Sequence, residues 1–217
     1  MGAAALTLYE TNSIPTDLQY LDERFANVRG DSRVEVLFSA GRWLEGPAYS
    51  PQGRFLLFSD VPNDRTLKLD EMTGVVSLFD KPSEFANGRT FDRTGRALTC
   101  LHGGRAVVRQ EHDGSVTRLP TTYEGKHLNS PNDVVVDSRG FVWFTDPWYG
   151  LLNEYDGHVA SQELGHQGVY RWSDGMSEPE LMIGDLSQPT ALPSRPTRRP
   201  CTSSTAIVER STPSTRI

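Results

Sequence analysis

Long hydrophobic runs, cysteines and a surplus of positive charge are all scarce in this sequence. No window approaches eighteen consecutive apolar residues, which argues against a membrane-spanning segment. The two cysteines, Cys100 and Cys201, are too few for a disulfide framework, and no C-x-x-C pair or histidine cluster indicates zinc. The formal net charge of −6 disfavours nonspecific nucleic-acid binding, which needs a basic field. We therefore expect neither a membrane nor a nucleic-acid partner.

Targeting signals are also missing from the amino terminus. The stretch MGAAALTLYETNSIP has no basic segment, and Glu10 interrupts its apolar run, so it does not match a signal peptide. Leu6 stands where N-myristoylation requires serine or threonine. From these absences we expect a soluble, cytoplasmic protein.

Helical periodicity is almost absent as well. The only candidate helix is Thr16 to Asn27, in which Leu18, Leu21 and Phe25 fall roughly on one face. What the sequence does contain is 217 residues with 36% apolar and 23% charged side chains, which is enough to build a globular core. The sequence therefore predicts an all-β protein.

Three segments share one layout: GPAYSPQGRFLLFSD, ANGRTFDRTGRALTC and PNDVVVDSRGFVWFTD. In each, a short apolar strand leads to a polar turn closed by glycine, and a second apolar strand follows. The glycines, Gly53, Gly95 and Gly140, lie 42 and 45 residues apart, which is the period of a propeller blade.

A second, weaker hairpin follows each of these segments. Its turns lie at Met72–Gly74, Asp113–Gly114 and Asp174–Gly175, and Asp-Gly pairs are strong turn signals. Two hairpins per period make the four strands of one blade. A sandwich or barrel would also show short, evenly spaced strands, but it would not require the same residues to recur at matched positions. We predict about three propeller blades and part of a fourth.

The segment 190–217 does not follow this pattern. It has no glycine, one acidic residue and five arginines among many Ser, Thr and Pro residues, a composition typical of a disordered basic tail. If one nucleotide is restored at the Thr190 codon, the genetic code permits QPNGLAFSPDEKALYVIDS, a fourth copy of the first hairpin. We therefore hypothesise that the segment is translated out of frame and that the natural protein has two or three more blades. The predicted regions are a lead-in over 1–40, an incomplete propeller over 41–189 and this tail.

One residue at the start of each repeat is a candidate for function. In a propeller, the loops that lead into the inner strands converge at one mouth of the central channel. Glu45, Asn87 and Asn132 stand at these positions, and carboxylate and amide oxygens suit Ca²⁺ or Mg²⁺. Each residue also has a plain structural interpretation: a solvated glutamate, or asparagines that form turns. Asp133 is expected to bond the backbone, and His102 is expected to make a loop hydrogen bond.

Together EGP, SDVPN, FANGRTFDRTGR, SPNDVVVDSRGFVWFTDPWYG and GVYRW resemble the SMP-30/gluconolactonase/LRE family over roughly Trp43 to Pro189. This resemblance implies a six-bladed propeller that hydrolyses small-molecule lactones or related esters. It also implies a central divalent ion, commonly Ca²⁺, with Zn²⁺, Mg²⁺ or Mn²⁺ as alternatives. By resemblance, Glu45 and Asn132 are metal ligands, and Asn132 also faces the substrate. Asn87 is a further candidate for substrate binding from its position alone, with a turn as the equal alternative.

The resemblance is incomplete in the later repeats. The family's next asparagine ligand belongs to a PNG motif, where this chain has Gln188-Pro189-Thr190. The family's catalytic aspartate has no counterpart, so no catalytic residue is assigned. We expect this chain to bind Ca²⁺ weakly or not at all, to lack lactonase activity and to be poorly soluble. A non-catalytic propeller scaffold and a phosphotriesterase-like hydrolase on the same fold remain alternatives.

Overall fold

The structure is a computed structural model that describes residues 13–14, 22–24 and 34–192. The chain divides into two compact units, Met1–Gly41 and Arg42–Ile217. In the first unit, β1 (Ser13–Ile14) pairs antiparallel with β2 (Val34–Glu35). The candidate helix Thr16 to Asn27 lies outside the described residues except for 22–24, and the segment 193–217 lies wholly outside them.

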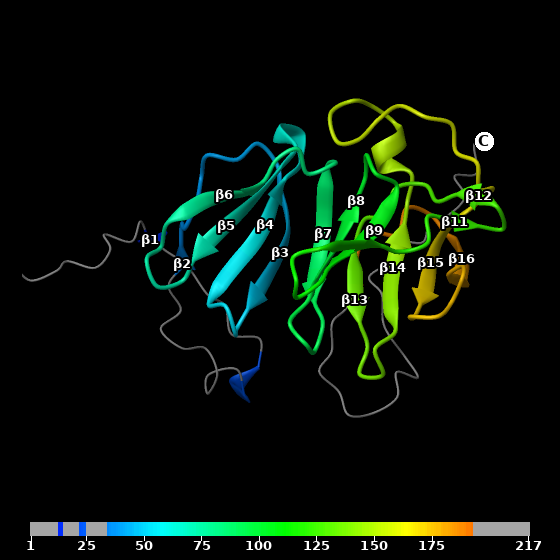
Figure 1. Cartoon of the computed structure of the whole chain (residues 1–217). Coiled ribbons are helices and arrows are strands. Elements are labelled where there is room, and N and C mark those ends of the chain that lie inside the picture. The colour runs from blue at the N-terminus through cyan, green and yellow to red at the C-terminus, as the bar shows by residue number, and fades with distance from the viewer. Residues whose placement is uncertain (1–12, 15–21, 25–33, 193–217) are drawn as a thin grey trace, which may run out of the picture. The chain divides into compact units, whose positions relative to one another are not determined.

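The second unit contains three four-stranded antiparallel sheets, each with its strands in chain order. They are β3 (Leu44–Ser50), β4 (Phe55–Asp60), β5 (Arg65–Asp70) and β6 (Val76–Asp80); β7 (Ala86–Phe91), β8 (Ala97–Leu101), β9 (Ala106–Gln110) and β10 (Val116–Arg118); and β13 (Val134–Val136), β14 (Val142–Asp146), β15 (Gln167–Trp172) and β16 (Glu180–Leu186). This order is that of a propeller blade, so the predicted pairs of hairpins are confirmed. The strands β3, β7 and β13 lie side by side (Figure 1).

Short elements fill the connections between these strands. They are the hairpin β11 (Thr122–Tyr123) with β12 (Lys126–His127), and the 3-10 turns η2 (Val61–Asn63) and η3 (Tyr149–Leu151). None of these three was predicted from the sequence, because each is too short to show periodicity.

Glycine determines most of the predicted turns through its backbone freedom. At Gly95 and Gly140 the φ angles are +90° and +89°, a region that side chains with a Cβ rarely adopt. The first turn differs from the prediction: Arg54 takes the left-handed conformation, with φ of 50°, and Gly53 does not. Gly53 is needed for space instead, since a Cβ there would lie 2.2 Å from the Phe55 ring.

A continuous apolar core lies between the second and third sheets. Strands of both sheets supply it, and within it the rings of Phe144 and Tyr170 stack with centroids 5.4 Å apart. Cys100 is fully buried within this core as a free thiol, as expected for a cysteine at the end of an apolar strand. The core holds the two sheets together, so the residues at the ends of their inner strands have fixed positions.

Candidate metal and substrate site

The three predicted site residues occupy equivalent places at one end of the sheets. Glu45, Asn87 and Asn132 each lie eight residues before the turn glycine of their repeat. Glu45 and Asn87 are the second residues of β3 and β7, slightly inside the strands rather than just before them, and Asn132 precedes β13 by two residues. We call this the leading end of the sheets, and the end that carries Gly53, Gly95 and Gly140 the turn end.

Adjacent repeats approach each other closely at the leading end. A Cβ on Gly46 would lie 2.1 Å from the carbonyl oxygen of Asn87, and one on Gly88 would lie 2.3 Å from that of Asn132. The backbone N–H of Gly88 also donates to the Asn132 carbonyl oxygen at 2.8 Å. These contacts hold the three site positions on neighbouring backbones.

Glu45 has one carboxylate oxygen bound and one open. The indole Nε1–H of Trp43 donates to Oε1 of Glu45 at 2.8 Å. No hydrogen bond from another described residue reaches its Oε2. The carboxylate is therefore oriented by Trp43 while keeping an oxygen available.

The amide of Asn132 is oriented by a histidine from the second sheet. His102, which is 1% exposed, places Nδ1 at 2.9 Å from the carbonyl oxygen of Asp156 and Nε2 at 3.1 Å from Asn132 Nδ2. Burial lowers the pKa of His102, so its ring is neutral near pH 7. The expected hydrogen bond of His102 is thus confirmed, but its partner Asn132 lies 30 residues away and was not predicted.

Asn87 and Asp133 have contrasting surroundings. Asn87 is 6% exposed, yet neither polar atom of its side chain bonds another described residue. Burial raises the pKa of Asp133, whose carboxylate accepts backbone N–H groups from Val134 at 2.9 Å and Leu192 at 2.8 Å. Asp133 thus bonds the backbone, as expected. The negative charge of Glu45 also raises this pKa, which indicates that the two carboxylates lie within electrostatic range.

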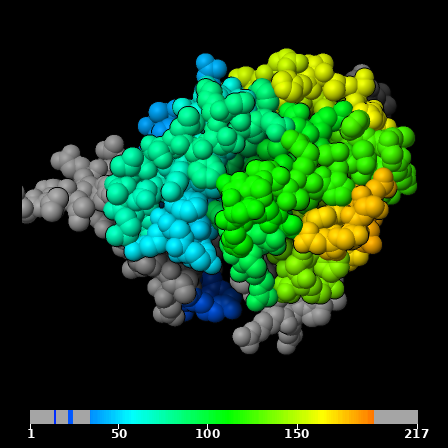
Figure 2. Space-filling model, viewed as in Figure 1, coloured from blue at the N-terminus to red at the C-terminus, as the bar shows by residue number. Residues whose placement is uncertain are grey.

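A long connection between β14 and β15, residues 147–166, reaches the same end. Its Asp156 bonds His102, its His158 packs edge-on against Phe85, and its Tyr155 ring lies 6.4 Å from that of Trp43. It therefore contacts all three repeats. In Figure 2 its yellow atoms lie above the green atoms of the second sheet.

The sequence profile described as the SMP-30/Gluconolactonase/LRE-like region matches residues 43–199. The chain belongs to this family. It is 36% identical over 177 residues to the gluconolactonase of Zymomonas mobilis, a match covering 73% of this chain and 48% of that protein. The structure of a gluconolactonase from Xanthomonas campestris superimposes with a TM-score of 0.76 at 36% identity, covering 83% of this chain and 61% of that one. The chain thus spans about half the length of the curated relative.

These comparisons confirm the all-β propeller prediction. The calcium-binding protein regucalcin from Agrobacterium tumefaciens shares the fold, with a TM-score of 0.52 at 16% identity, covering 72% of this chain and 48% of that one. No described helix is long and apolar enough to cross a membrane.

The site residues of this family member fit a hard cation. Within the described residues no group of three or more His, Cys, Asp or Glu could hold a metal ion. The leading end instead offers oxygens of one carboxylate and two amides, from Glu45, Asn87 and Asn132. Ca²⁺ takes carboxylate and amide oxygens, whereas the absence of sulfur disfavours soft metals. A single carboxylate predicts weak binding.

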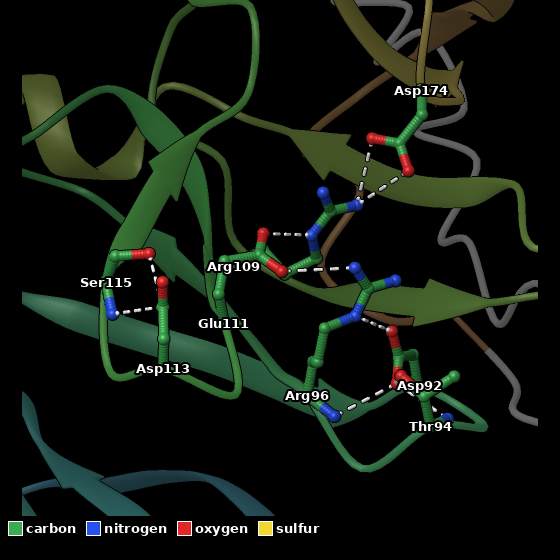
Figure 3. A network of polar contacts seen from close by, with 8 residues as sticks. All are labelled: Asp92, Thr94, Arg96, Arg109, Glu111, Asp113, Ser115 and Asp174. Atoms are coloured by element: carbon green, nitrogen blue, oxygen red, sulfur yellow. Dashed lines mark hydrogen bonds and ion pairs between the residues drawn. The ribbon is translucent and has the colours of Figure 1, made fainter.

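At the turn end, charged groups are matched with one another (Figure 3). A chain of ion pairs runs from Asp92 through Arg96, Glu111 and Arg109 to Asp174, with N–O distances between 2.7 and 3.1 Å. Burial raises the pKa of Asp92, but hydrogen bonds from Thr94 and Arg96 outweigh it, and the pKa lies below its ordinary value. All of these charged residues except Glu111 line a pocket between the second and third sheets, yet their charges are already paired.

Proposed function

We propose that the protein to which this chain belongs is a metal-dependent hydrolase of lactones, with Ca²⁺ as the first candidate and Zn²⁺, Mg²⁺ or Mn²⁺ as alternatives. One observation carries the proposal. Three adjacent repeats place Glu45, Asn87 and Asn132 at equivalent positions of the leading end, and an oxygen of each has no partner among the described residues. Relatives named gluconolactonases at 36% identity support a lactone as substrate.

In this proposal Glu45 and Asn132 hold the cation. A bound divalent cation would supply Lewis acidity toward the lactone carbonyl oxygen. Trp43 orients the Glu45 carboxylate, His102 orients the Asn132 amide, and the amide of Asn87 binds the substrate. The general base that activates water is not assigned within this chain.

Part of the proposed ligand set is missing. The asparagine that the family resemblance places at residue 190 is a threonine here, and no hydrogen bond joins its hydroxyl to a described residue. By resemblance the family's catalytic aspartate is the fourth cation ligand, and it has no counterpart in this chain, so only Glu45 and Asn132 of the four expected ligands are present. We expect weak Ca²⁺ binding, with a dissociation constant on the order of 1 mM or above. We expect no hydrolysis by the 217-residue chain alone.

The test uses this chain and a chimera that continues it from residue 190 with the matching part of the Zymomonas mobilis gluconolactonase. Cation binding is measured by Ca²⁺-dependent melting and by Tb³⁺ luminescence, which the Trp43 indole can sensitise. Glu45→Gln should abolish both signals, whereas Glu71→Gln, in the turn after β5, should change neither. The chimera should hydrolyse gluconolactone or dihydrocoumarin, and Glu45→Gln should remove this activity.

Each alternative function predicts a different result. If Ca²⁺, Mg²⁺, Mn²⁺ and Zn²⁺ leave the melting temperature of both proteins unchanged, a non-catalytic scaffold is favoured. If the chimera cleaves a phosphotriester but no lactone, a phosphotriesterase-like hydrolase is favoured. If this chain by itself hydrolyses a lactone and loses that activity in Glu45→Gln, the missing ligands are not needed.

A further inference from the structure

We propose that His102 is a positioning residue: with its proton on Nδ1, it holds the amide of Asn132 so that Oδ1, and not Nδ2, is offered to a cation. This inference rests on the proposed function. It assigns His102 no contact with substrate and no proton transfer.

The position of the ring proton follows from its two partners. A backbone carbonyl can only accept a hydrogen bond, so the Nδ1 atom facing Asp156 must carry the proton. The atom that faces Nε2 is Nδ2 of Asn132, at 3.1 Å, and an amide NH₂ group can only donate a hydrogen bond, so Nε2 accepts. This arrangement leaves Oδ1 of Asn132 turned away from the ring.

Packing holds this arrangement in place. A Cβ on Gly150 would lie 2.7 Å from Cβ of His102 and 2.9 Å from its Cγ. The backbone of the connection 147–166 therefore packs closely against the His102 side chain. The Gly150 backbone N–H is itself fixed by Ser130 Oγ at 3.0 Å. Because the ring cannot turn easily, the hydrogen bond discriminates between the two orientations of the asparagine amide.

The orientation matters because the two ends of an amide affect a cation oppositely. The oxygen attracts a cation, and the N–H groups repel it. An asparagine that is free to rotate must be ordered when the cation binds, whereas the bond from His102 orders it beforehand. Partners that orient metal ligands typically change metal affinity about 10- to 100-fold when removed.

The first measurement is the protonation of the imidazole in the wild-type chain, read from long-range ¹H–¹⁵N spectra of the histidine rings. The His102 signals are identified by their loss in His102→Gln. We expect the proton on Nδ1. A proton on Nε2, or on both nitrogens, near pH 7 overturns the inference, whether or not a cation binds.

The second measurement separates positioning from packing. Glutamine can accept from Asn132 and donate to Asp156, whereas leucine can do neither. In His102→Leu the protected side-chain NH₂ signal of Asn132 should be lost and Tb³⁺ affinity should fall about tenfold or more. His102→Gln should retain both, and His112→Leu, at an exposed turn, is the control.

Unchanged NH₂ protection in His102→Leu, or a loss in His102→Gln equal to that in His102→Leu, contradicts the inference. If His102→Leu does not fold, the wild-type ring spectrum and His102→Gln still decide. If the wild type binds no Tb³⁺, the proposed cation site fails, and the spectra still confirm or refute the orientation of Asn132.

Discussion

At the turn end of the sheets charged side chains are matched with one another, whereas at the leading end several polar groups have no partner. The turn end has the continuous chain from Asp92 to Asp174. The leading end leaves oxygens of Glu45, Asn87 and Asn132 without partners among the described residues. Both ends belong to the same repeated strands, so the difference does not come from the fold.

This difference supports the proposal that the leading end is the binding end of the sheets. None of these oxygens is among the fully buried polar atoms of the described residues that lack a hydrogen-bond partner, so they remain accessible to a ligand. An oxygen-bearing side chain at the same position of three adjacent repeats supports a shared ligand there. The matched ion pairs of the turn end need no ligand.

Asp146, near the leading end, should give the largest effect on stability. It is fully buried, and burial raises its pKa to about 7, while hydrogen bonds from Asn129 act in the opposite direction. Because the folded-state pKa exceeds the ordinary value, the folded protein binds the proton more tightly than the unfolded chain does. Stability therefore falls as the pH rises from about 4 to about 7 and stays low above that range.

The corresponding variant is Asp146→Asn, which removes the charge and keeps an acceptor for the Asn129 N–H. The rise in the Asp146 pKa from 3.8 to about 7 corresponds to roughly 4 kcal/mol in the free energy of unfolding. Asp146→Asn should therefore be more stable than the wild type by about this amount at about pH 8, and no more stable at about pH 4. Urea denaturation at both pH values measures it. An Asp92→Asn control should behave oppositely and lose stability at neutral pH, since its folded-state pKa is lowered.

Gly46 tests the close approach of the repeats at the leading end. Gly46 and Gly95 both have positive φ, +54° and +90°. A Cβ added at Gly46 would meet the backbone of Asn87, whereas a Cβ added at Gly95 would meet no described residue within 4 Å beyond its chain neighbours. Gly95→Ala should cost about 1–2 kcal/mol from conformation alone. Gly46→Ala should cost about 3 kcal/mol in total, because the Asn87 backbone must also move. Thermal denaturation measures both variants. If Gly46→Ala and Gly95→Ala lose the same stability, the close approach of Gly46 to the Asn87 backbone adds no cost of its own.

Substitution of Arg109 tests the contribution of the ion pairs at the turn end. It is largely buried and bridges Glu111 and Asp174, although Asp174 is 67% exposed. Arg109→Leu should cost about 1–2 kcal/mol and leave Tb³⁺ binding unchanged, because its partners are partly solvated. Arg139→Leu, whose side chain is 65% exposed, is the control and should stay within about 0.5 kcal/mol. A change in cation binding in Arg109→Leu would mean that the two ends are not independent.

The sequence period predicted the four strands of each large sheet, and with them the equivalent positions of Glu45, Asn87 and Asn132, because strands and glycine turns are local features. It could not predict which side chains pair across repeats. The bond between His102 and Asn132 depends on the packing of Gly150, and the ion pair of Arg109 with Asp174 joins residues 65 apart. These contacts depend on how sheets pack, which is not encoded in a local pattern.

Substitution of Trp43, at the leading end, should have the smallest effect on stability of these variants, and it should act on cation binding instead. Its indole is 45% exposed and donates one hydrogen bond, to Oε1 of Glu45. Trp43→Phe keeps most of the ring and removes the donor, so the free energy of unfolding should change by less than about 0.5 kcal/mol. Loss of one orienting hydrogen bond, worth about 0.5–1 kcal/mol, should weaken Ca²⁺ binding about two- to fivefold in the chimera, measured by calorimetry. A loss of stability without a change in affinity would instead place Trp43 among the structural residues, with Glu45 oriented by its backbone alone.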